Sequence, residues 1–185
     1  GTETLTFNGN VSNVGSVTLA GQGAGDVVDI NDDIEAGGAV AISMADTVQI
    51  LADGTEITGN DGTIAIDMSA VGAIELDGSG TLTLTGEGDG AIDLAPVSTL
   101  TGASLSVGAQ GSVTLSGVNL SGPSNGSLTV ALDGTGVDEL DVSGPISFVD
   151  SLTFSGDLAN NDVMDIDQDV SAGSITVQNA QTLSV

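Results

Sequence analysis

The chain reads SVTLAGQGAGDVVDINDDIEAGGAVAISMADTVQI over residues 16–50 and SLTFSGDLANNDVMDIDQDVSAGSITVQNAQTLSV over residues 151–185, and the two segments align with single-residue gaps. Both contain a leading strand-like run, a D-V-hydrophobic-D-I run, an A-G turn and a closing run. A looser copy occupies residues 81–115. Internal repetition of this kind is typical of solenoid proteins. We therefore predict that residues 1–185 form a single elongated β-repeat domain.

The local pattern favours β-strands over helices. Apolar residues alternate with small polar ones, as in residues 82–84, 128–130 and 175–177. A period of two indicates strands with one buried side. The 28 glycines, together with abundant Ser, Thr, Asn and Asp, supply turn residues at short intervals. We expect almost no helix.

A shorter signature sets the expected coil length: an aliphatic residue followed in most copies by Ser, Thr or Glu and then Gly or Ala. It occurs at Val11, Ile34, Ile57, Leu84, Leu100, Leu120, Val142 and Val170. The seven intervals average about 23 residues, a length within the range of solenoid repeats. We predict a right-handed parallel β-solenoid (β-helix) of about eight coils. An antiparallel β-sandwich is the alternative, because short strands with regularly spaced turns also indicate that fold.

The composition excludes several functions. The chain has 26 Asp and Glu residues and no Lys, Arg or His, for a net charge of -26. Without basic residues it has no electrostatic footprint for nucleic acid and no polybasic membrane patch. The absence of His, Lys, Cys, Tyr and Trp removes the usual catalytic bases and nucleophiles, so we predict that the protein is not an enzyme. The mean hydropathy of +0.31 predicts a folded chain.

Three stretches resemble a known class of bacterial surface protein. They are DIEAGGAVAISMADTVQI (residues 33–50), GTEITGNDGTIAID (54–67) and GSGTLTLTGEGDGAIDL (78–94). They look like the β-strand repeats of filamentous-haemagglutinin-type adhesins and autotransporter passenger domains. The resemblance implies a right-handed β-solenoid on a bacterial surface with adhesive or scaffold duties. It carries over no catalytic or receptor-binding residue.

These observations set our expectations for function. No charged and apolar leader opens the sequence at Gly1, so we expect an extracellular or cell-surface protein whose signal peptide has been removed. Strand pattern runs to both ends of the sequence, so we expect a structural subunit whose partner is itself, stacked head to tail in a surface filament or matrix fibre. Other surface or matrix components are a further class of partner; nucleic acid and membrane insertion are not expected. The alternative is an adhesin or receptor-binding module of a large secreted passenger protein.

Acidic residues gather in two equivalent segments of the repeat, and we consider them as calcium ligands. In an extended strand, Asp165, Asp167 and Asp169 would face one side. Ca²⁺ takes six to eight oxygen ligands and would relieve their repulsion. The candidate ligands are therefore Asp29, Asp32, Asp33, Asp165, Asp167 and Asp169. The alternative is a solvated acidic face with diffuse counterions.

Two uncharged features complete the sequence analysis. The run Thr81, Thr83 and Thr85 resembles flat ice-binding faces on β-solenoids. Because we find no repetition of such runs in register from coil to coil, we interpret them as surface residues favoured by strand propensity. The chain also has no Asp or Glu between Asp93 and Asp133. That segment is predicted to be either a lateral packing surface or a buried part of the solenoid.

Overall fold

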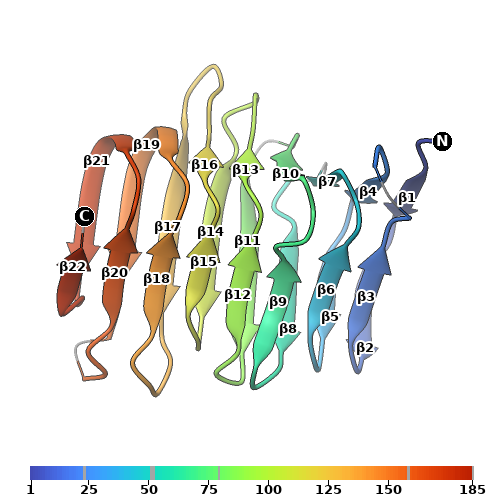
Figure 1. Cartoon of the computed structure of the whole chain (residues 1–185). Coiled ribbons are helices and arrows are strands. Elements are labelled where there is room, and N and C mark those ends of the chain that lie inside the picture. Colours follow the sequence, from blue (N-terminus) through green and yellow to red (C-terminus); the bar gives the residue numbers. More distant parts are fainter. Residues whose placement is uncertain (23, 51–52, 79, 158, 185) are drawn as a thin grey trace.

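A computed structural model describes residues 1–22, 24–50, 53–78, 80–157 and 159–184 of the chain. Its strands pair in parallel with strands of neighbouring coils and wind into a β-solenoid of about eight turns, and no described residue is helical. The N- and C-terminal ends lie at opposite ends of the rod (Figure 1). The predicted parallel β-solenoid is confirmed, and parallel pairing excludes the antiparallel sandwich.

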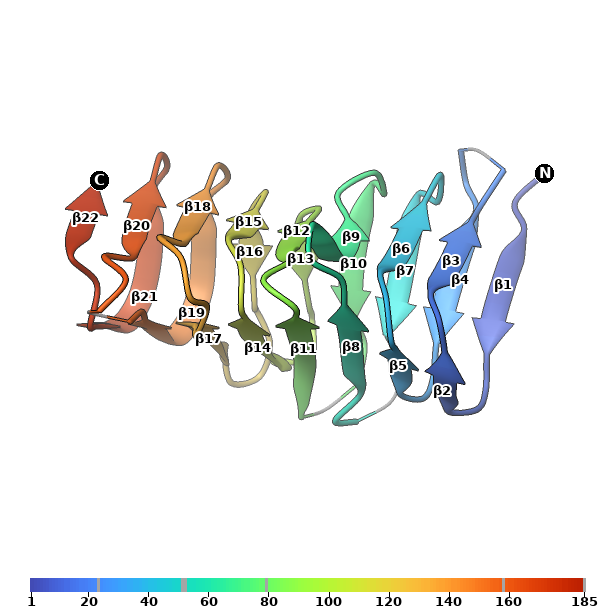
Figure 2. The ribbon, with the colours of Figure 1, turned by 90° about the horizontal axis from the view of Figure 1, so that it is seen from below.

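The solenoid has three faces, whose strands lie in coil order along the rod (Figures 1 and 2). Face 1 contains β1 (Thr4–Phe7), β4 (Val27–Ile30), β7 (Thr47–Ile50), β10 (Ala73–Leu76), β13 (Val97–Ser98), β16 (Val118–Asn119) and the start of β19 (Ile146–Ser155). Face 2 contains β2 (Val11–Val14), β5 (Ile34–Ala36), β8 (Glu56–Asn60), β11 (Thr81–Glu87), β14 (Ser104–Ala109), β17 (Gly126–Leu132), the rest of β19, and β21 (Val170–Gln178) except its start, which pairs with Ile146 on face 1. Face 3 contains β3 (Val17–Ala20), β6 (Val40–Ser43), β9 (Ile64–Met68), β12 (Ala91–Leu94), β15 (Val113–Leu115), β18 (Glu139–Val142), β20 (Val163–Ile166) and β22 (Thr182–Ser184). β19 crosses the corner between faces 1 and 2 and joins them into one sheet.

The interior consists of aliphatic columns that run the length of the rod. On each face the same inward position pairs with its equivalent in the next coil. The face 3 column is Val17, Val40, Ile66, Ile92, Val113, Leu140, Met164 and Leu183. Its interior members are at most 1% exposed. Burying one such side chain contributes about 1.5–3 kcal/mol, so the columns hold the coils together.

The 23-residue signature follows one column only in the first half of the chain. Val11, Ile34, Ile57 and Leu84 stack on face 2. The residue that follows Leu84 in this column is Val107, not the predicted Leu100. Leu100 is 86% exposed, beyond the end of β13 on face 1. The coil number was predictable, but the alignment of the later coils was wrong.

A β-bulge in β9 accounts for one longer coil. Ala91 of β12 pairs with Ile64 of β9, whereas Ile92 pairs with Ile66. Ala65 is therefore an extra residue of β9 with no partner in β12. Ala65 is fully buried. A Cβ on Gly59 would lie 2.0 Å from the carbonyl oxygen of Ala65. Glycine at position 59 thus provides the space that the inserted residue fills.

Candidate functional site

The first set of predicted calcium ligands lies near the N-terminal end. Asp29 is on β4, and its Oδ2 atom accepts a hydrogen bond from Thr6 Oγ1 at 3.3 Å, while its Oδ1 atom is buried without a partner among the described residues. Asp32 and Asp33 follow in the turn before β5. Asp32 Oδ1 accepts from the Asp33 backbone N–H at 2.9 Å, and Asp33 Oδ1 accepts from the Glu56 N–H at 2.8 Å. Two of these carboxylates therefore cap backbone groups.

The second predicted set lies near the opposite end and is not arranged as expected. Asp165 is an outward residue of β20, but this strand ends at Ile166. Asp167 and Asp169 are exposed residues of the turn into β21. The expectation of three carboxylates along one extended strand was wrong, because the chain turns the corner between faces 3 and 1 directly after Ile166.

The described part of the chain contains no group of three or more acidic side chains close enough together to hold a metal ion. The two predicted sets belong to different coils at opposite ends of the rod. Calcium binding at Asp29, Asp32, Asp33, Asp165, Asp167 and Asp169 stays a prediction.

Two aspartates of the same acidic segments are buried at corners of the solenoid. Asp26 Oδ1 accepts a hydrogen bond from the Glu3 N–H at 3.0 Å, and its Oδ2 accepts from the Gln22 N–H at 2.6 Å. Asp162, which is 1% exposed, binds the Asp138 and Asp157 N–H groups at 3.1 and 2.6 Å. Each carboxylate thus binds one N–H of the preceding coil and one of its own loop. These residues join coils and are structural.

Asp138 is the third buried aspartate and the one with the least favourable surroundings. It is 9% exposed, and its Oδ2 atom is buried without a hydrogen-bond partner among the described residues. Burial raises the pKa of the Asp138 carboxyl, and the negative charges of Asp162 and Asp89 raise it further. No basic side chain can offset these effects, because the sequence has no Lys, Arg or His.

Outward positions of face 3 form an acidic column. Asp67 pairs with Asp93, and Asp141 pairs with Asp165. Thr114 lies between Asp93 and Asp141 and separates the two pairs. Neighbouring parallel strands are about 4.8 Å apart, so paired carboxylates repel each other and attract mobile cations.

The N-terminal half of face 2 also carries acidic side chains. A hollow of about 290 Å³ is lined by Asn10, Asp33, Ile34, Glu35, Glu56, Thr58, Thr85 and Glu87. Its carboxylates come from β5, β8 and β11 and from the turn before β5. This hollow favours small cations over anions and over apolar ligands.

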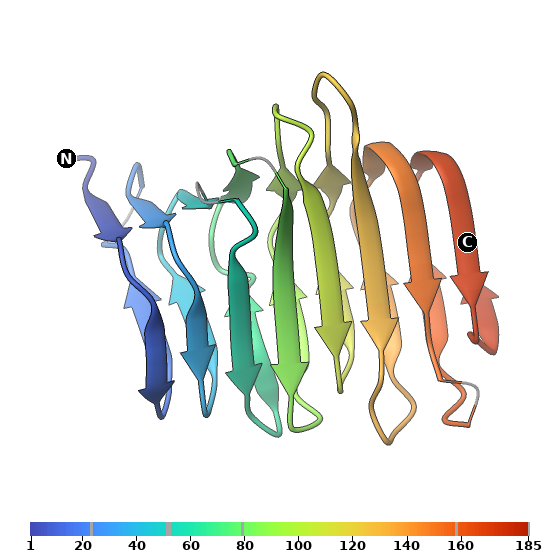
Figure 3. The ribbon, with the colours of Figure 1, turned by 180° about the vertical axis from the view of Figure 1, so that it is seen from behind.

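The strands of the C-terminal half of face 2 follow one another regularly along the rod (Figure 3). The outward residues at their centres are uncharged. The central column is Thr83, Ser106, Thr129, Thr153 and Thr176 on β11, β14, β17, β19 and β21. A flanking column is Thr81, Ser104, Ser127, Ser151 and Ser174, and the other flank adds Thr85 and Ser155. We call these residues the hydroxyl array. Two hydroxyl positions of β11 thus recur in register over five coils, with serine at many of them. The threonine run itself is not repeated, because Thr85 is followed by Gly108, Ala131, Ser155 and Gln178.

The neutral segment between Asp93 and Asp133 does not form one surface. It includes β13, β14, β15, β16 and β17, which lie on all three faces. The uncharged surface is built instead from one strand of each of five coils. Its sequence signal is the recurring run of three outward small residues, as in residues 81–85, 104–108, 127–131 and 151–155.

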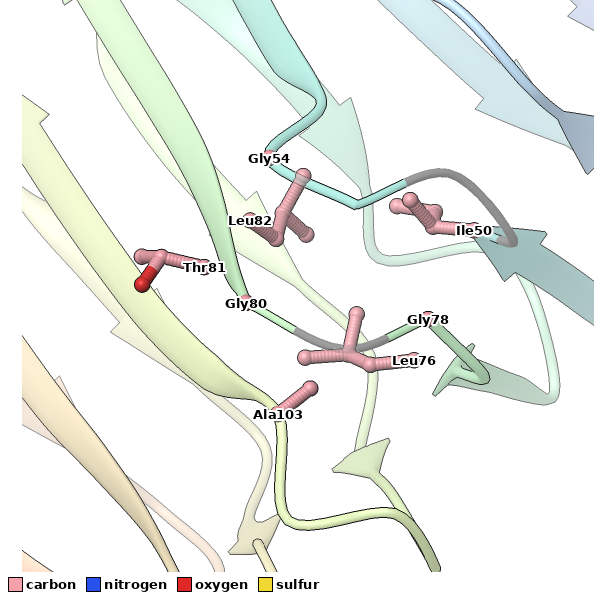
Figure 4. Close-up of a pocket in the computed structure, with 8 residues that line it drawn as sticks. All are labelled: Ile50, Gly54, Leu76, Gly78, Gly80, Thr81, Leu82 and Ala103. Carbon is pink, nitrogen blue, oxygen red and sulfur yellow. The ribbon is translucent and has the colours of Figure 1, made fainter.

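A hollow near the corner of faces 1 and 2 is too small for a ligand. Ile50, Gly54, Leu76, Gly78, Gly80, Thr81, Leu82 and Ala103 line it (Figure 4). Its volume is about 10 Å³, which is at most the space of one water molecule. The lining residues include no ionisable side chain.

No family model, no curated protein and no solved structure matches the chain. In the described part of the chain no helix is long and apolar enough to cross a membrane.

Proposed function

We propose that the protein is a non-enzymatic structural subunit of the cell surface or extracellular matrix, which stacks head to tail into a filament. The observation that carries this proposal is the apolar exposure at both end coils. Leu5 in the first coil is 44% exposed, and Val177 and Leu183 in the last coil are 37% and 52% exposed. The equivalent positions of interior coils are buried.

The two ends are complementary in register. The face 2 column begins at Val11 and reaches Val177, and the face 3 column begins at Val17 and reaches Leu183. A second copy placed on the last coil sets Val11 against Val177 and Val17 against Leu183, and so continues both columns. Strand edges that are open at both ends gain ladder hydrogen bonds in the same step. Such a heterologous contact repeats without closing and produces a filament.

Charge controls this association. Each copy carries -26, so stacking concentrates negative charge along the rod. Mobile cations must screen it, since no side chain of the chain is basic. Filaments are therefore expected to form at moderate salt or with millimolar Ca²⁺ and to shorten at low ionic strength or with a chelator.

Electron microscopy of the purified chain tests the proposal, with two matched variants. Val177→Asp places a carboxylate in the apolar end surface and is expected to abolish filaments. Gln178→Asp adds the same charge at the neighbouring exposed position and is expected to leave them intact. Circular dichroism verifies that both variants fold.

The alternative is an adhesin module within a large secreted passenger protein, in which adjoining coils of the same chain would cover the end surfaces. In that case the 185-residue chain stays monodisperse at every salt, Ca²⁺ and protein concentration. That result, or filaments that persist in Val177→Asp, overturns the head-to-tail proposal.

A further inference from the structure

We propose that the hydroxyl array on the C-terminal half of face 2 is a pairing surface for a second copy of this chain. Two copies pack face to face through the array, antiparallel, about a two-fold axis near Thr129. The array consists of outward residues of face 2, whereas stacking uses the inward residues and the open strand edges of the end coils; β21 contributes to both surfaces. The pairing therefore does not require head-to-tail stacking. Lateral bundling of filaments, in contrast, depends on both.

The charge distribution supports a self-pair. Two copies with a charge of -26 each repel wherever acidic faces meet. Face 3 presents its aspartate column, and the N-terminal half of face 2 presents the acidic hollow. The array contains no charged residue. Its bordering acidic residues are Glu56, which pairs with Thr83 at the N-terminal border, and Glu87, Asp133, Asp150 and Asp157. Close approach there costs less electrostatic energy than at the aspartate column of face 3 or at the acidic hollow.

Hydroxyl groups make the array complementary to itself. Each Ser or Thr hydroxyl donates one hydrogen bond and accepts others, so two identical arrays satisfy each other. Some of these groups already link coils: Ser151 Oγ donates to Ser127 Oγ at 2.9 Å, and Ser104 Oγ accepts from the Ser127 N–H at 3.0 Å. The central threonine column makes no side-chain hydrogen bond among the described residues and is available to a partner.

The position of the array selects an antiparallel arrangement. Thr129 is the central member of its five-coil column. A two-fold axis at Thr129 sets Thr83 opposite the partner's Thr176 and Ser106 opposite the partner's Thr153. The part of the acidic hollow on β5 and β8 then lies beyond the partner's last coil. Its border on β11, with Thr85 and Glu87, lies opposite the partner's β21, whose residues carry no charge.

The area predicts a weak pair. Five strands about 4.8 Å apart and five residues wide cover about 400 Å² per copy. A stable interface usually buries about 800 Å² per partner. Individual chains therefore pair transiently, while filaments, which repeat the contact many times, associate firmly through multivalency.

Cysteine crosslinking tests the pairing, because the chain has no other cysteine. Thr129→Cys places a thiol near the proposed axis. Thr114→Cys places one at an equally half-buried outward position of face 3 and is the control. A bis-maleimide that spans roughly 10 Å bridges packed sheets. About 0.5 M NaCl reduces charge repulsion by shortening the Debye length to roughly 4 Å. Each crosslinking rate is divided by the rate at which N-ethylmaleimide modifies the same thiol, which corrects for differences in thiol reactivity between the two variants.

The expected result is dimer formation at least about tenfold faster for Thr129→Cys than for Thr114→Cys. Equal normalised rates overturn the proposal, whether or not filaments form. If the wild-type chain also shapes growing ice crystals while the two rates are equal, the array binds crystalline water instead. A failure of end-to-end stacking alone leaves the crosslinking result unchanged, so the two proposals are separable.

Filament bundles provide a second readout. Thr129→Glu opposes two like charges at the axis and is expected to leave single filaments without bundles, whereas Thr114→Glu keeps the bundles. Bundles that persist in Thr129→Glu contradict the pairing.

Discussion

Asp162 Oδ1 accepts a hydrogen bond from the backbone N–H of Asp138 at 3.1 Å, which brings two aspartates of neighbouring coils together inside one corner of the solenoid. The Asp162 carboxylate is satisfied by this bond and by the Asp157 N–H. Asp138 Oδ2, in contrast, is buried without a partner among the described residues. Two like groups in one corner thus have opposite effects on stability.

Asp138→Asn is expected to raise the free energy of unfolding at pH 7 by on the order of 1 kcal/mol, because it removes a buried, repelled charge. The pKa of Asp138 is raised in the fold by burial, by Asp162 and by Asp89. Its favourable contribution is therefore complete below the ordinary carboxyl pKa and is lost as pH rises through the raised value. Urea unfolding of wild type and variant at several pH values should show the difference shrinking as pH falls. A difference that is independent of pH contradicts this account.

Asp26→Ala is expected to destabilise the fold by about 1–3 kcal/mol, because it leaves the part-buried Glu3 and Gln22 N–H groups without their acceptor. Asp167→Ala, at an exposed turn, is expected to change stability by no more than about 0.5 kcal/mol. Thermal and urea unfolding measure both. Equal effects would show that the corner carboxylate does not join the coils.

Residue parity explains which aspartates could have been located from sequence. In DVVDI (residues 26–30) and DVMDI (residues 162–166) the first aspartate lies an even number of residues from the buried apolar residues, so Asp26 and Asp162 point inward. Asp29 and Asp165 lie an odd number of residues away and point outward. That signal was present in the sequence. The sequence contains no signal for the end of β20 at Ile166, because nothing in DIDQDV (residues 165–170) marks where the strand turns a corner.

Alternation also determined how much of the fold was predictable. It predicts strands, since every face repeats an apolar-x-apolar pattern, whereas the recurrence of the short signature predicts parallel coils and their average length. The same uniformity conceals which face a strand occupies: residues 16–50 begin on face 3 with β3, whereas residues 81–115 begin on face 2 with β11. Loop lengths also differ between coils. The signature therefore aligns Leu100 with Leu84, although the residue that stacks on Leu84 in the next coil is Val107. The hydroxyl array was missed for this reason.

Gly59→Ala is expected to destabilise the protein by about 3 kcal/mol, because the new Cβ would lie 2.0 Å from the Ala65 carbonyl oxygen. Gly108 is the matched control, since it is also a strand glycine of face 2 and a Cβ there meets nothing within 4 Å. Gly108→Ala is expected to be neutral or to stabilise by about 0.5 kcal/mol. If both variants unfold at the wild-type midpoint, the bulge at Ala65 is not tightly packed.

The acidic column of face 3 makes stability depend on cations. Asp67 and Asp93 are direct neighbours in the ladder, and like charges so placed cost about 0.2–1 kcal/mol. Asp93→Asn is therefore expected to raise the melting temperature by roughly 1–2 °C at about 10 mM NaCl. At about 0.5 M NaCl it is expected to have no effect, because salt already screens the repulsion between Asp67 and Asp93 in the wild-type chain. The melting temperature in millimolar Ca²⁺, compared with that in NaCl of equal ionic strength, distinguishes general charge screening from binding of Ca²⁺ at a specific site. A calcium centre at Asp29, Asp32 and Asp33 predicts a further, saturable rise that Asp33→Asn removes. A melting temperature that follows ionic strength alone would show that the carboxylates act together as a diffuse charge.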